Sequence, residues 1–271
     1  MAGVDNDTPE LAAVYDRISD SQFQGGLQLL ALMGLRKSDL VLDVGCGTGR
    51  LALHAAGEVC PSGSVTGIDP SPHRVRVAQE KQQAAGVQNV SFSLGQGENL
   101  GSLPDGHYDA VYYSAVFHWI GDKKAALREA YRVLKPGGTV GIYTGCRGDL
   151  SSTRSYLRQL ALVHAGGWPA RRGGRASLWL NEAEMEALLA EAGFAAILVE
   201  RRPTVKYFQS PDEYFLWLKA SSSGRRSNAP EHVRAEFRRR FAEELEKRRT
   251  PQGIPIESSL LFATASRPRQ G

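Results

Sequence analysis

The chain has 271 residues, 42% of them hydrophobic, and a formal net charge of +4. No apolar run approaches the roughly 20 residues that cross a bilayer, and the N-terminus lacks the basic and apolar regions of a secretory signal. Three widely spaced cysteines and six scattered histidines argue against a disulfide framework and a metal-ligand pattern. These features predict a single domain over residues 1–271, without a metal, in the cytoplasm.

The positive charge is unevenly distributed along the chain. Residues 147–226 hold 12 of the 33 Lys and Arg residues but only 8 of the 29 Asp and Glu residues, so the whole excess lies in this segment. One interpretation is a set of ordinary solvated faces, and the other is a segment that meets an anionic partner. In residues 231–249 basic and acidic residues alternate along one amphipathic helix, which predicts a solvated outer face and no nucleic-acid partner.

The first predicted element is a helix over residues 9–34. Pro9 stands near its start, and Leu27, Leu30 and Ala31 give it an apolar side. We expect this side to pack against the rest of the domain.

Residues 41–50, VLDVGCGTGR, predict a strand, a tight turn and the start of a helix over residues 50–57. Because the turn glycines at positions 45, 47 and 49 lack a Cβ, a ligand can approach closely, and the helix N-terminus offers unpaired N–H groups. A helix C-cap, a hairpin turn and a nucleotide or phosphate site are the alternatives. No Lys-Ser or Lys-Thr follows, which excludes a P-loop, and Arg50 stands where the nicotinamide fingerprint needs its third glycine.

This stretch resembles motif I of the class I S-adenosylmethionine (SAM) methyltransferases. The resemblance implies that SAM is the cofactor and that Asp43 lies beside its methionine end. It also assigns the turn residues to the cofactor site, namely Gly45, Cys46, Gly47 and Gly49.

An aromatic residue near the N-terminus adds to the resemblance. Related methyltransferases carry an aromatic-Asp element that lies over the cofactor, and Tyr15 of Tyr15-Asp16-Arg17 matches it. The alternative is an ordinary half-buried tyrosine.

A second strand over residues 65–68 ends at Asp69. In α/β nucleotide folds an acid at this strand tip, roughly 20 residues after the glycines, hydrogen-bonds the ribose hydroxyls. Pro70 and Ser71 then begin a helix over residues 72–85, so Asp69 is alternatively a helix N-cap. The two roles are compatible, and we assign Asp69 and Pro70 to the cofactor site.

A third strand over residues 90–94 ends in the sequence GQGENL. Related methyltransferases place an acid after the first glycine to accept a hydrogen bond from the adenine amino group. This chain has Gln96 there, whose side-chain oxygen accepts such a bond without a charge. We expect Glu98 to serve instead and Gly97 to let the adenine ring stack close to the backbone.

Residues 108–119, YDAVYYSAVFHW, form a fourth strand and its tip. The tip lacks the Pro-Pro-aromatic signature of amino-group methyltransferases that act on nucleic acids. It resembles instead the Asn/Ser-Ala-x-x-His-Trp of the trans-aconitate methyltransferase family. This resemblance places Ser114 at the cofactor, and His118 and Trp119, at the start of the next helix, at the acceptor.

The second half is predicted to continue the alternation of helices and strands. A Pro136-Gly137-Gly138 turn feeds a fifth strand, and Asn181 with Glu184 predicts a capping box. The remaining elements are a helix over 150–165, a basic loop over 166–176, a helix over 182–192, a strand over 196–202, helices from 211 and over 231–249, and a strand over 256–266.

Elements in this order predict an α/β fold with a doubly wound, Rossmann-like sheet. The resemblance implies seven strands in the order 3-2-1-4-5-7-6, the last antiparallel. It also implies that residues 203–252 form a helical cap insertion over the acceptor site, because the Trp-Leu-x5-Gly-Arg stretch of residues 217–225 is similar to that of trans-aconitate and malonyl-carrier carboxyl methyltransferases.

The implied function is SAM-dependent transfer of a methyl group to a small molecule, anionic and methylated on a carboxylate or other oxygen. A carboxylate needs no base, whereas an alcohol or a protonated amine does, and His118 is the candidate base or binding residue. Further residues assigned to the acceptor are Arg175, Trp217, Arg225 and Arg226.

Two other functions stay open. Trp168, Trp179 and Trp217 favour an O- or N-methyltransferase of an aromatic secondary metabolite. Gln96, which replaces the expected acid, is the one feature that favours a protein that binds SAM without transferring its methyl group. We expect neither a nucleic acid nor a membrane as a partner.

Overall fold

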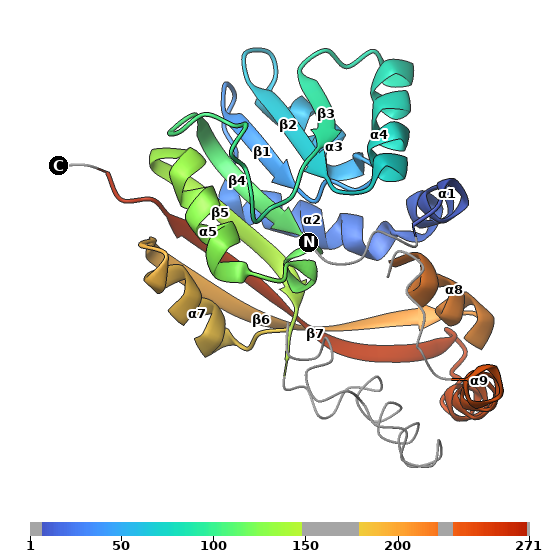
Figure 1. Cartoon of the computed structure of the whole chain (residues 1–271). Coiled ribbons are helices and arrows are strands. Elements are labelled where there is room, and N and C mark those ends of the chain that lie inside the picture. The colour runs from blue at the N-terminus through green and yellow to red at the C-terminus, as the bar shows by residue number, and fades with distance from the viewer. Residues whose placement is uncertain (1–6, 148–178, 222–229, 270–271) are drawn as a thin grey trace.

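The computed structural model describes residues 7–147, 179–221 and 230–269, which form an α/β fold (Figure 1). Its strands are β1 Leu40–Val44, β2 Ser64–Asp69, β3 Val90–Leu94, β4 Tyr108–Ser114, β5 Leu134–Gly145, β6 Ala195–Phe208 and β7 Ile254–Ser266. Its helices are α1 Pro9–Ile18, α2 Asp20–Met33, α3 Arg50–Val59, α4 Pro72–Ala85, the 3-10 helix η1 Phe117–Trp119, α5 Lys123–Val133, α7 Glu182–Glu191, α8 Pro211–Ser221 and α9 Glu231–Glu246. Within these ranges, no helix is long and apolar enough to cross a membrane.

The strands form one sheet in the order β3-β2-β1-β4-β5-β7-β6. Strands β1 to β5 pair in parallel, and β7 runs antiparallel to both β5 and β6. The strand order and the antiparallel last strand expected from the sequence are therefore confirmed. Because the early strands are parallel, the carboxyl ends of β1, β2 and β4 lie along one edge of the sheet, where α/β folds bind their ligands.

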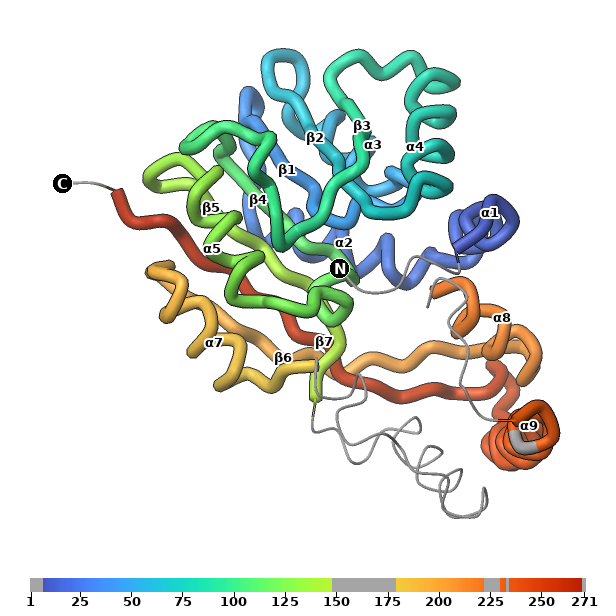
Figure 2. The backbone as a smooth tube through the Cα atoms, in the orientation of Figure 1, coloured from blue at the N-terminus to red at the C-terminus, as the bar shows by residue number. Residues whose placement is uncertain are grey.

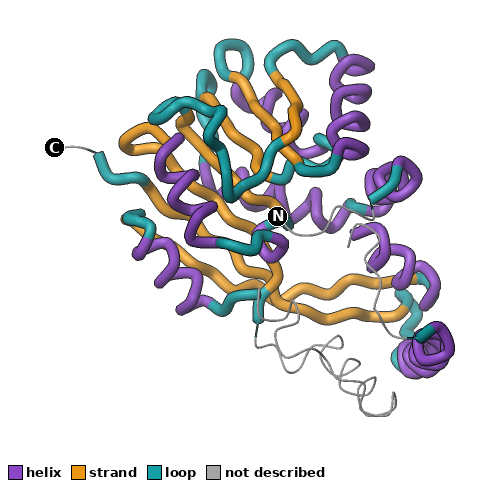
Figure 3. Tube along the Cα trace, viewed as in Figure 1, coloured by secondary structure: helices purple, strands orange, loops and turns teal. Residues whose placement is uncertain are grey.

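Helices cover both faces of the sheet (Figures 1 and 3). On one face α2, α3 and α4 bury apolar residues such as Leu29, Ala52 and Val75. On the other face α5 and α7 bury residues such as Leu127 and Leu189. This layering explains why the early strands are apolar on both sides.

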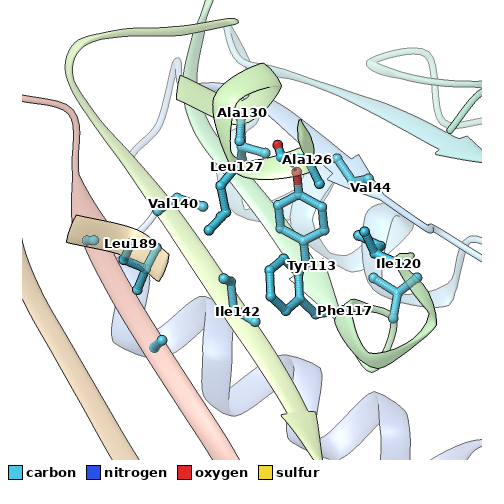
Figure 4. Packing of buried hydrophobic residues seen from close by; sticks show 14 of the residues in the cluster. Val44, Tyr113, Phe117, Ile120, Ala126, Leu127, Ala130, Val140, Ile142 and Leu189 are labelled. Carbon is cyan, nitrogen blue, oxygen red and sulfur yellow. Dashed lines mark hydrogen bonds between the residues drawn. The ribbon is translucent and has the colours of Figure 1, made fainter. Parts of the chain in front are cut away.

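The core beneath α5 anchors the tip of β4 (Figure 4). The hydroxyl of Tyr113 donates to the backbone oxygen of Ala126 at 3.0 Å. Its ring meets Phe117 edge to face, with 5.3 Å between the centroids, and both rings are buried. The chain segment that follows β4 is thereby fixed at the edge of the sheet.

The N-terminal region is two helices, not the single helix predicted over residues 9–34. The break falls at Ser19, which is buried and ends α1 at φ −90° and ψ 22°. It lets α2 lie against β4 and β5 while α1 turns away to contact α4 and α8. The prediction failed because no proline or glycine marks the break.

The last two strands are longer than predicted. Strand β6 continues past Arg202 to Phe208, so residues 203–208 of the expected helical cap are strand and pair with the first half of β7. Side chains alternate along this stretch, with Lys206 and Phe208 turned inward and Val205 exposed. The long antiparallel pair of β6 and β7 extends beyond the other strands (Figure 2).

Helices α8 and α9, which lie between β6 and β7 in the sequence, pack at the far end of this strand pair (Figures 1 and 2). They form a third buried cluster with it, composed of Phe208, Tyr214, Phe241, Leu245, Ile254 and Ile256. Within the described residues, these two helices are the helical part of the predicted insertion. The predicted helix over 150–165 and the loop over 166–176 lie outside the described residues.

Candidate active site

The glycine turn follows β1 directly and is fastened to β2. The backbone N–H groups of Gly45 and Cys46 both donate to the carbonyl oxygen of Ile68, at 2.7 and 2.9 Å. Gly45 has φ +81°, and a Cβ there would lie 2.3 Å from Cγ2 of Val116. Gly45 is therefore required by the packing of the turn itself.

Of the three glycines of the turn, Gly47 is the one with open space beside it. It has φ +55°, and among the described residues the one atom within 4 Å of an added Cβ is Cε1 of Tyr15, at 3.7 Å. Gly49, in contrast, begins α3 and is packed against Ala78 and Phe92, each 2.8 Å from an added Cβ. A ligand can thus approach the turn at Gly47, beneath the ring of Tyr15.

Asp69 ends β2 and is buried at 6% exposure. Its Oδ2 accepts from the N–H of Gly47 at 3.0 Å, and its Oδ1 accepts from the N–H of Ser71 at 2.9 Å. Ser71, not Asp69, is the N-cap of α4, which settles that alternative, and Pro70 is half-buried between them. Burial raises the pKa of Asp69, while Arg74 and the two N–H groups oppose the increase. Each carboxylate oxygen keeps a further lone pair for a ligand hydroxyl.

Asp43 is the second buried carboxyl, at 2% exposure. The hydroxyl of Tyr112 donates to its Oδ2 at 2.9 Å, whereas its buried Oδ1 has no hydrogen-bond partner among the described residues. Burial raises the pKa of Asp43 to about 8, Tyr112 opposes this, and the charge of Asp69 adds to it. A buried carboxyl oxygen without a partner is costly, and a cationic or hydrogen-donating ligand group would satisfy it.

Tyr15 of α1 lies over the turn, and the next residue, Asp16, holds α1 in place. Burial raises the pKa of the Tyr15 hydroxyl, the charge of Arg74 lowers it, and the charges of Asp69 and Asp43 raise it further. Asp16 accepts at its Oδ1 from the hydroxyl of Thr48 and from Nζ of Lys81, both at 2.7 Å. This role of Asp16 was not predicted from the sequence, although its position beside Tyr15 was a usable signal.

The tip of β3 is tightly packed. Gly97 is buried, and an added Cβ would lie 3.0 Å from Cγ1 of Val44. Glu98 accepts at its Oε1 from the N–H of Gly121 at 3.0 Å, and Gln96 is exposed. This packing accounts for the glycine, while contact of all three residues with an adenine ring stays a prediction.

The segment after β4 brings His118 to the same edge of the sheet. Ser114 ends β4, and Ala115 adopts φ +55°, a left-handed conformation that costs an L-residue about 1 kcal/mol or more. Nδ1 of His118 lies 3.0 Å from Oγ1 of Thr144 on β5. The imidazole is thus oriented by a hydroxyl that the sequence analysis did not single out.

Two tryptophans surround His118. Its ring centroid lies 5.1 Å from that of Trp119 and 5.8 Å from that of Trp179. The prediction that His118 and Trp119 begin the next helix is wrong, because they belong to the separate 3-10 turn η1. Helix α5 starts at Lys123, where the side chain of Asp122 caps its N-terminus.

The comparison with known families bears on this site. Residues 42–142, which run from β1 into β5, match the methyltransferase domain family. This match assigns residues 42–142 to the methyltransferase domain family. SAM is the methyl donor of this family, as the resemblance of the glycine turn implied.

The curated relatives align with this chain over only part of their own length. The chain is 39% identical to the demethylmenaquinone methyltransferase of Listeria welshimeri over 111 residues, which are 41% of this chain and 47% of that protein. It is 30% identical to the arsenite methyltransferase of Halobacterium salinarum over 193 residues, 70% of this chain and 46% of that protein. The chain thus spans about half the length of these relatives.

Solved structures share the fold over most of the chain. The YcgJ protein of Bacillus subtilis has a TM-score of 0.63 at 19% identity, with 92% of this chain and 99% of that chain covered. Phosphoethanolamine N-methyltransferase 2 of Haemonchus contortus, in complex with SAM, has a TM-score of 0.59 at 20% identity, with 90% and 52% covered. At these identities the likeness concerns the fold.

The residues at this site fit SAM in charge and in space. SAM carries an ammonium group, two ribose hydroxyls and an adenine. The unpartnered Oδ1 of Asp43 suits the ammonium, the lone pairs of Asp69 suit the hydroxyls, and the open face of Gly47 leaves space between them. These three features agree with one another although they come from separate strands and a turn.

The residues predicted to hold the acceptor are only partly described. Trp217 lies on α8 with its ring stacked on Tyr214, and Nζ of Lys206 lies 4.5 Å from its ring centroid. Its buried Nε1 has no hydrogen-bond partner within residues 7–147, 179–221 and 230–269. Four residues lie outside the described residues, namely Trp168, Arg175, Arg225 and Arg226.

Proposed function

We propose that this chain transfers the methyl group of SAM to a small molecule held beside His118. The observation that carries the proposal is the buried Oδ1 of Asp43, which lacks a partner at the edge of the sheet where Gly47 is open. A protein that folded without a ligand there would leave this oxygen at a cost of about 1–3 kcal/mol.

The cofactor roles follow from the placement of the polar groups. Asp69 accepts hydrogen bonds from the ribose hydroxyls, and Asp43 accepts one from the ammonium group. Tyr15 covers the ligand at Gly47, and residues 96–98 flank the adenine. Cys46, Gly49, Pro70 and Ser114 complete the walls of this site.

The methyl transfer itself depends mainly on positioning. SAM supplies an electrophilic methyl group, and the protein holds an acceptor atom in line with it. Such alignment lowers a barrier by roughly 7–11 kcal/mol without a covalent step on the protein. His118, oriented by Thr144 and flanked by Trp119, is proposed to bind the acceptor at this point.

The acceptor is proposed to be anionic and methylated on a carboxylate or other oxygen, as in the trans-aconitate methyltransferase family. The excess of positive charge in residues 147–226 supports this. Lys206 lies in that segment, and its inward-facing ammonium makes a hydrogen bond of 3.1 Å to Oγ of Ser21. Helices α8 and α9, as the helical cap within residues 203–252, are proposed to cover the acceptor.

An aromatic acceptor is the second candidate. The rings of Trp119 and Trp179 lie against His118, and such a pocket suits a planar ligand. In this case the atom methylated is an oxygen or nitrogen that must lose a proton, and His118 is the base. The names of the relatives include one acceptor of each kind, since demethylmenaquinone is a ring compound and arsenite is an oxyanion.

Labelled SAM tests the proposal and separates the candidates. The protein is incubated with SAM carrying a tritiated methyl group and with a metabolite extract, and the low-molecular-weight fraction is counted. We expect label in this fraction with the wild type and none with Gly47→Val. A carboxyl ester releases its label as volatile methanol in alkali, whereas an ether or N-methyl product keeps it. Binding of SAM without any transfer would indicate a non-catalytic protein and would overturn the proposal.

A further inference from the structure

Arg74 on α4 lies where four separate parts of the chain meet. Its Nε donates to Oδ2 of Asp7, in the segment before α1, at 2.8 Å. Its Nη2 donates to the carbonyl oxygen of Ala220 on α8 at 3.0 Å. Its guanidinium carbon lies 4.3 Å from the ring centroid of Tyr15 on α1. The fourth part is α4 itself, which follows the ribose acid Asp69.

These contacts are buried. Arg74 is 8% exposed, and the side chain of Asp7 is fully buried. The hydroxyl of Ser71 donates to the same Oδ2 of Asp7 at 2.7 Å, and within the described part of the chain the Oδ1 of Asp7 has no hydrogen-bond partner. Because a buried carboxylate without its cation is strongly unfavourable, Asp7 depends on Arg74 for its place.

Arg74 also acts on Asp69 through its charge. It is the leading influence that keeps the pKa of Asp69 from rising further on burial. Other titratable groups that act on Asp69 or are affected by its charge come from the N-terminal segment, α1, β1 and the glycine turn, namely Asp7, Tyr15, Asp43 and Cys46. All of these are acidic groups, so Arg74 is the cation among the groups named.

We propose that Arg74 is a positioning residue for the cofactor, which joins the N-terminal segment, α1 and α8 to the Asp69 end of β2. The proposal rests on the proposed function, because it takes Asp69 as the ribose acid and Tyr15 as the cover of the site. Through Arg74, the placement of α1 and α8 beside the cofactor site and the ionisation of Asp69 are coupled. In this proposal Arg74 acts through Asp69, Tyr15 and Asp7 and not by its own contact with the cofactor.

A guanidinium is the group that this junction needs. It presents donors in separate directions, which serve Asp7 and Ala220 together, and a flat face that stacks on Tyr15. A lysine keeps the charge near Asp69, but one ammonium does not span these three contacts. The charge and the geometry of Arg74 are therefore separable by mutation.

The experiment compares Arg74→Met, Arg74→Lys and Arg76→Met. Arg76 lies on the same helix, is exposed, and pairs with Glu80, so it is the matched control. Affinity for SAM is measured by calorimetry at about pH 6, 7.5 and 9. We expect Arg74→Met to weaken SAM binding roughly 10- to 100-fold at low pH, the range for a lost charge-assisted contact, and less at high pH. The loss shrinks as pH rises because Asp69 without its cation ionises only at higher pH.

Hydrogen exchange reports on the geometric part. Arg74→Met and Arg74→Lys should both speed exchange in residues 7–18 and 211–221 roughly 10-fold, since each loses the contacts to Asp7 and Ala220. Arg74→Lys should keep the pH profile of the wild type. Arg76→Met should change neither measurement, and kcat at saturating SAM should change less than KM for SAM in every variant.

A second variant separates positioning from folding. Asp7→Asn/Arg74→Met removes the stranded charge and should recover thermal stability without recovering SAM affinity. Recovery of both would mean that Arg74 is merely structural and would overturn the proposal, as would unchanged SAM binding in Arg74→Met. If Asp69→Ala weakens binding while Arg74→Met does not, the cofactor site stands and this inference alone fails. If the wild type binds no SAM, the proposed function fails first.

Discussion

The backbone N–H of Gly47 donates to Oδ2 of Asp69 at 3.0 Å, across 22 residues of sequence. This bond fixes the glycine turn after β1 to the tip of β2, so the two parts of the cofactor site keep one geometry. It also holds the carboxylate of Asp69 with one oxygen toward the turn. The site is thereby shaped before a ligand enters, which lowers the entropy that binding costs.

Replacement of Asp69 tests its role as the ribose acceptor. Asp69→Ala should weaken SAM binding by about 1.5–3 kcal/mol, because two ligand hydroxyls lose a charged acceptor. Isothermal titration calorimetry measures the change. Asp105→Ala is the control, since this carboxylate is exposed and pairs with Arg132 far from the turn. An unchanged affinity in Asp69→Ala would remove the residue from the cofactor site.

Substitutions at two glycines of the turn should have different effects. Gly47→Val places its side chain in the open space beneath Tyr15 and should abolish SAM binding while the protein stays folded. Gly45→Ala drives a Cβ into Val116 at 2.3 Å and should instead lower the melting temperature. Circular dichroism and calorimetry on the two variants separate these effects. Retained SAM binding by Gly47→Val would mean that the ligand does not cross this face.

The raised pKa of Asp43 predicts how stability depends on pH. In the folded chain Asp43 keeps its proton up to about pH 8, whereas in the unfolded chain it ionises near pH 4. The unfolded state therefore holds fewer protons between these values, and the contribution of Asp43 to stability falls as pH rises, by up to about 1.4 kcal/mol per unit. Below about pH 4 the contribution is fully present.

Asp43→Asn removes this dependence and serves as its test. The stability of the variant relative to the wild type should increase between about pH 5 and pH 7.5, measured by urea denaturation at each pH. The same substitution should weaken SAM binding, because the amide does not match the charge of the ammonium. Parallel stability curves for the two proteins would show that Asp43 titrates normally.

His118→Ala distinguishes the two acceptor classes. For a carboxylate acceptor, kcat should stay nearly flat between about pH 6 and pH 9, and the loss should appear in KM for the acceptor. For an alcohol or amine acceptor, kcat should fall by roughly 10²–10⁴ and the acidic limb of the pH profile should disappear. Steady-state kinetics on the acceptor that takes up label provide the measurement. His118→Phe is the matched second substitution, since a phenyl ring keeps the packing against Trp119.

Local patterns in the sequence were sufficient for several elements of this fold. The strand-turn-helix at residues 41–50 needs glycine at three alternate positions, and each position has a positive φ in the structure. Asn181 and Glu184 form the predicted capping box, with reciprocal bonds of 2.9 Å. These features depend on residues within a few positions of one another, which is why a single sequence reveals them.

Features that depend on distant partners were not predictable in this way. Ser19 breaks the first helix because α1 packs against α4 and α8, and nothing near Ser19 encodes those contacts. Strand β6 runs on to Phe208 because β7 pairs with it there, although Pro203 interrupts the pattern of the strand. Arg74 and Asp7 meet across 67 residues. Thr144 was likewise inconspicuous until β5 placed it beside His118.

A crystal structure with S-adenosylhomocysteine bound tests the central claim most directly. We predict that both ribose hydroxyls lie within about 2.6–3.0 Å of the carboxylate of Asp69, that the amino group meets Oδ1 of Asp43, and that the ligand crosses Gly47 beneath Tyr15. The same crystals grown from Gly47→Val protein should contain no ligand. A ligand bound away from the turn, or an empty turn in wild-type crystals grown at millimolar ligand, would contradict the account.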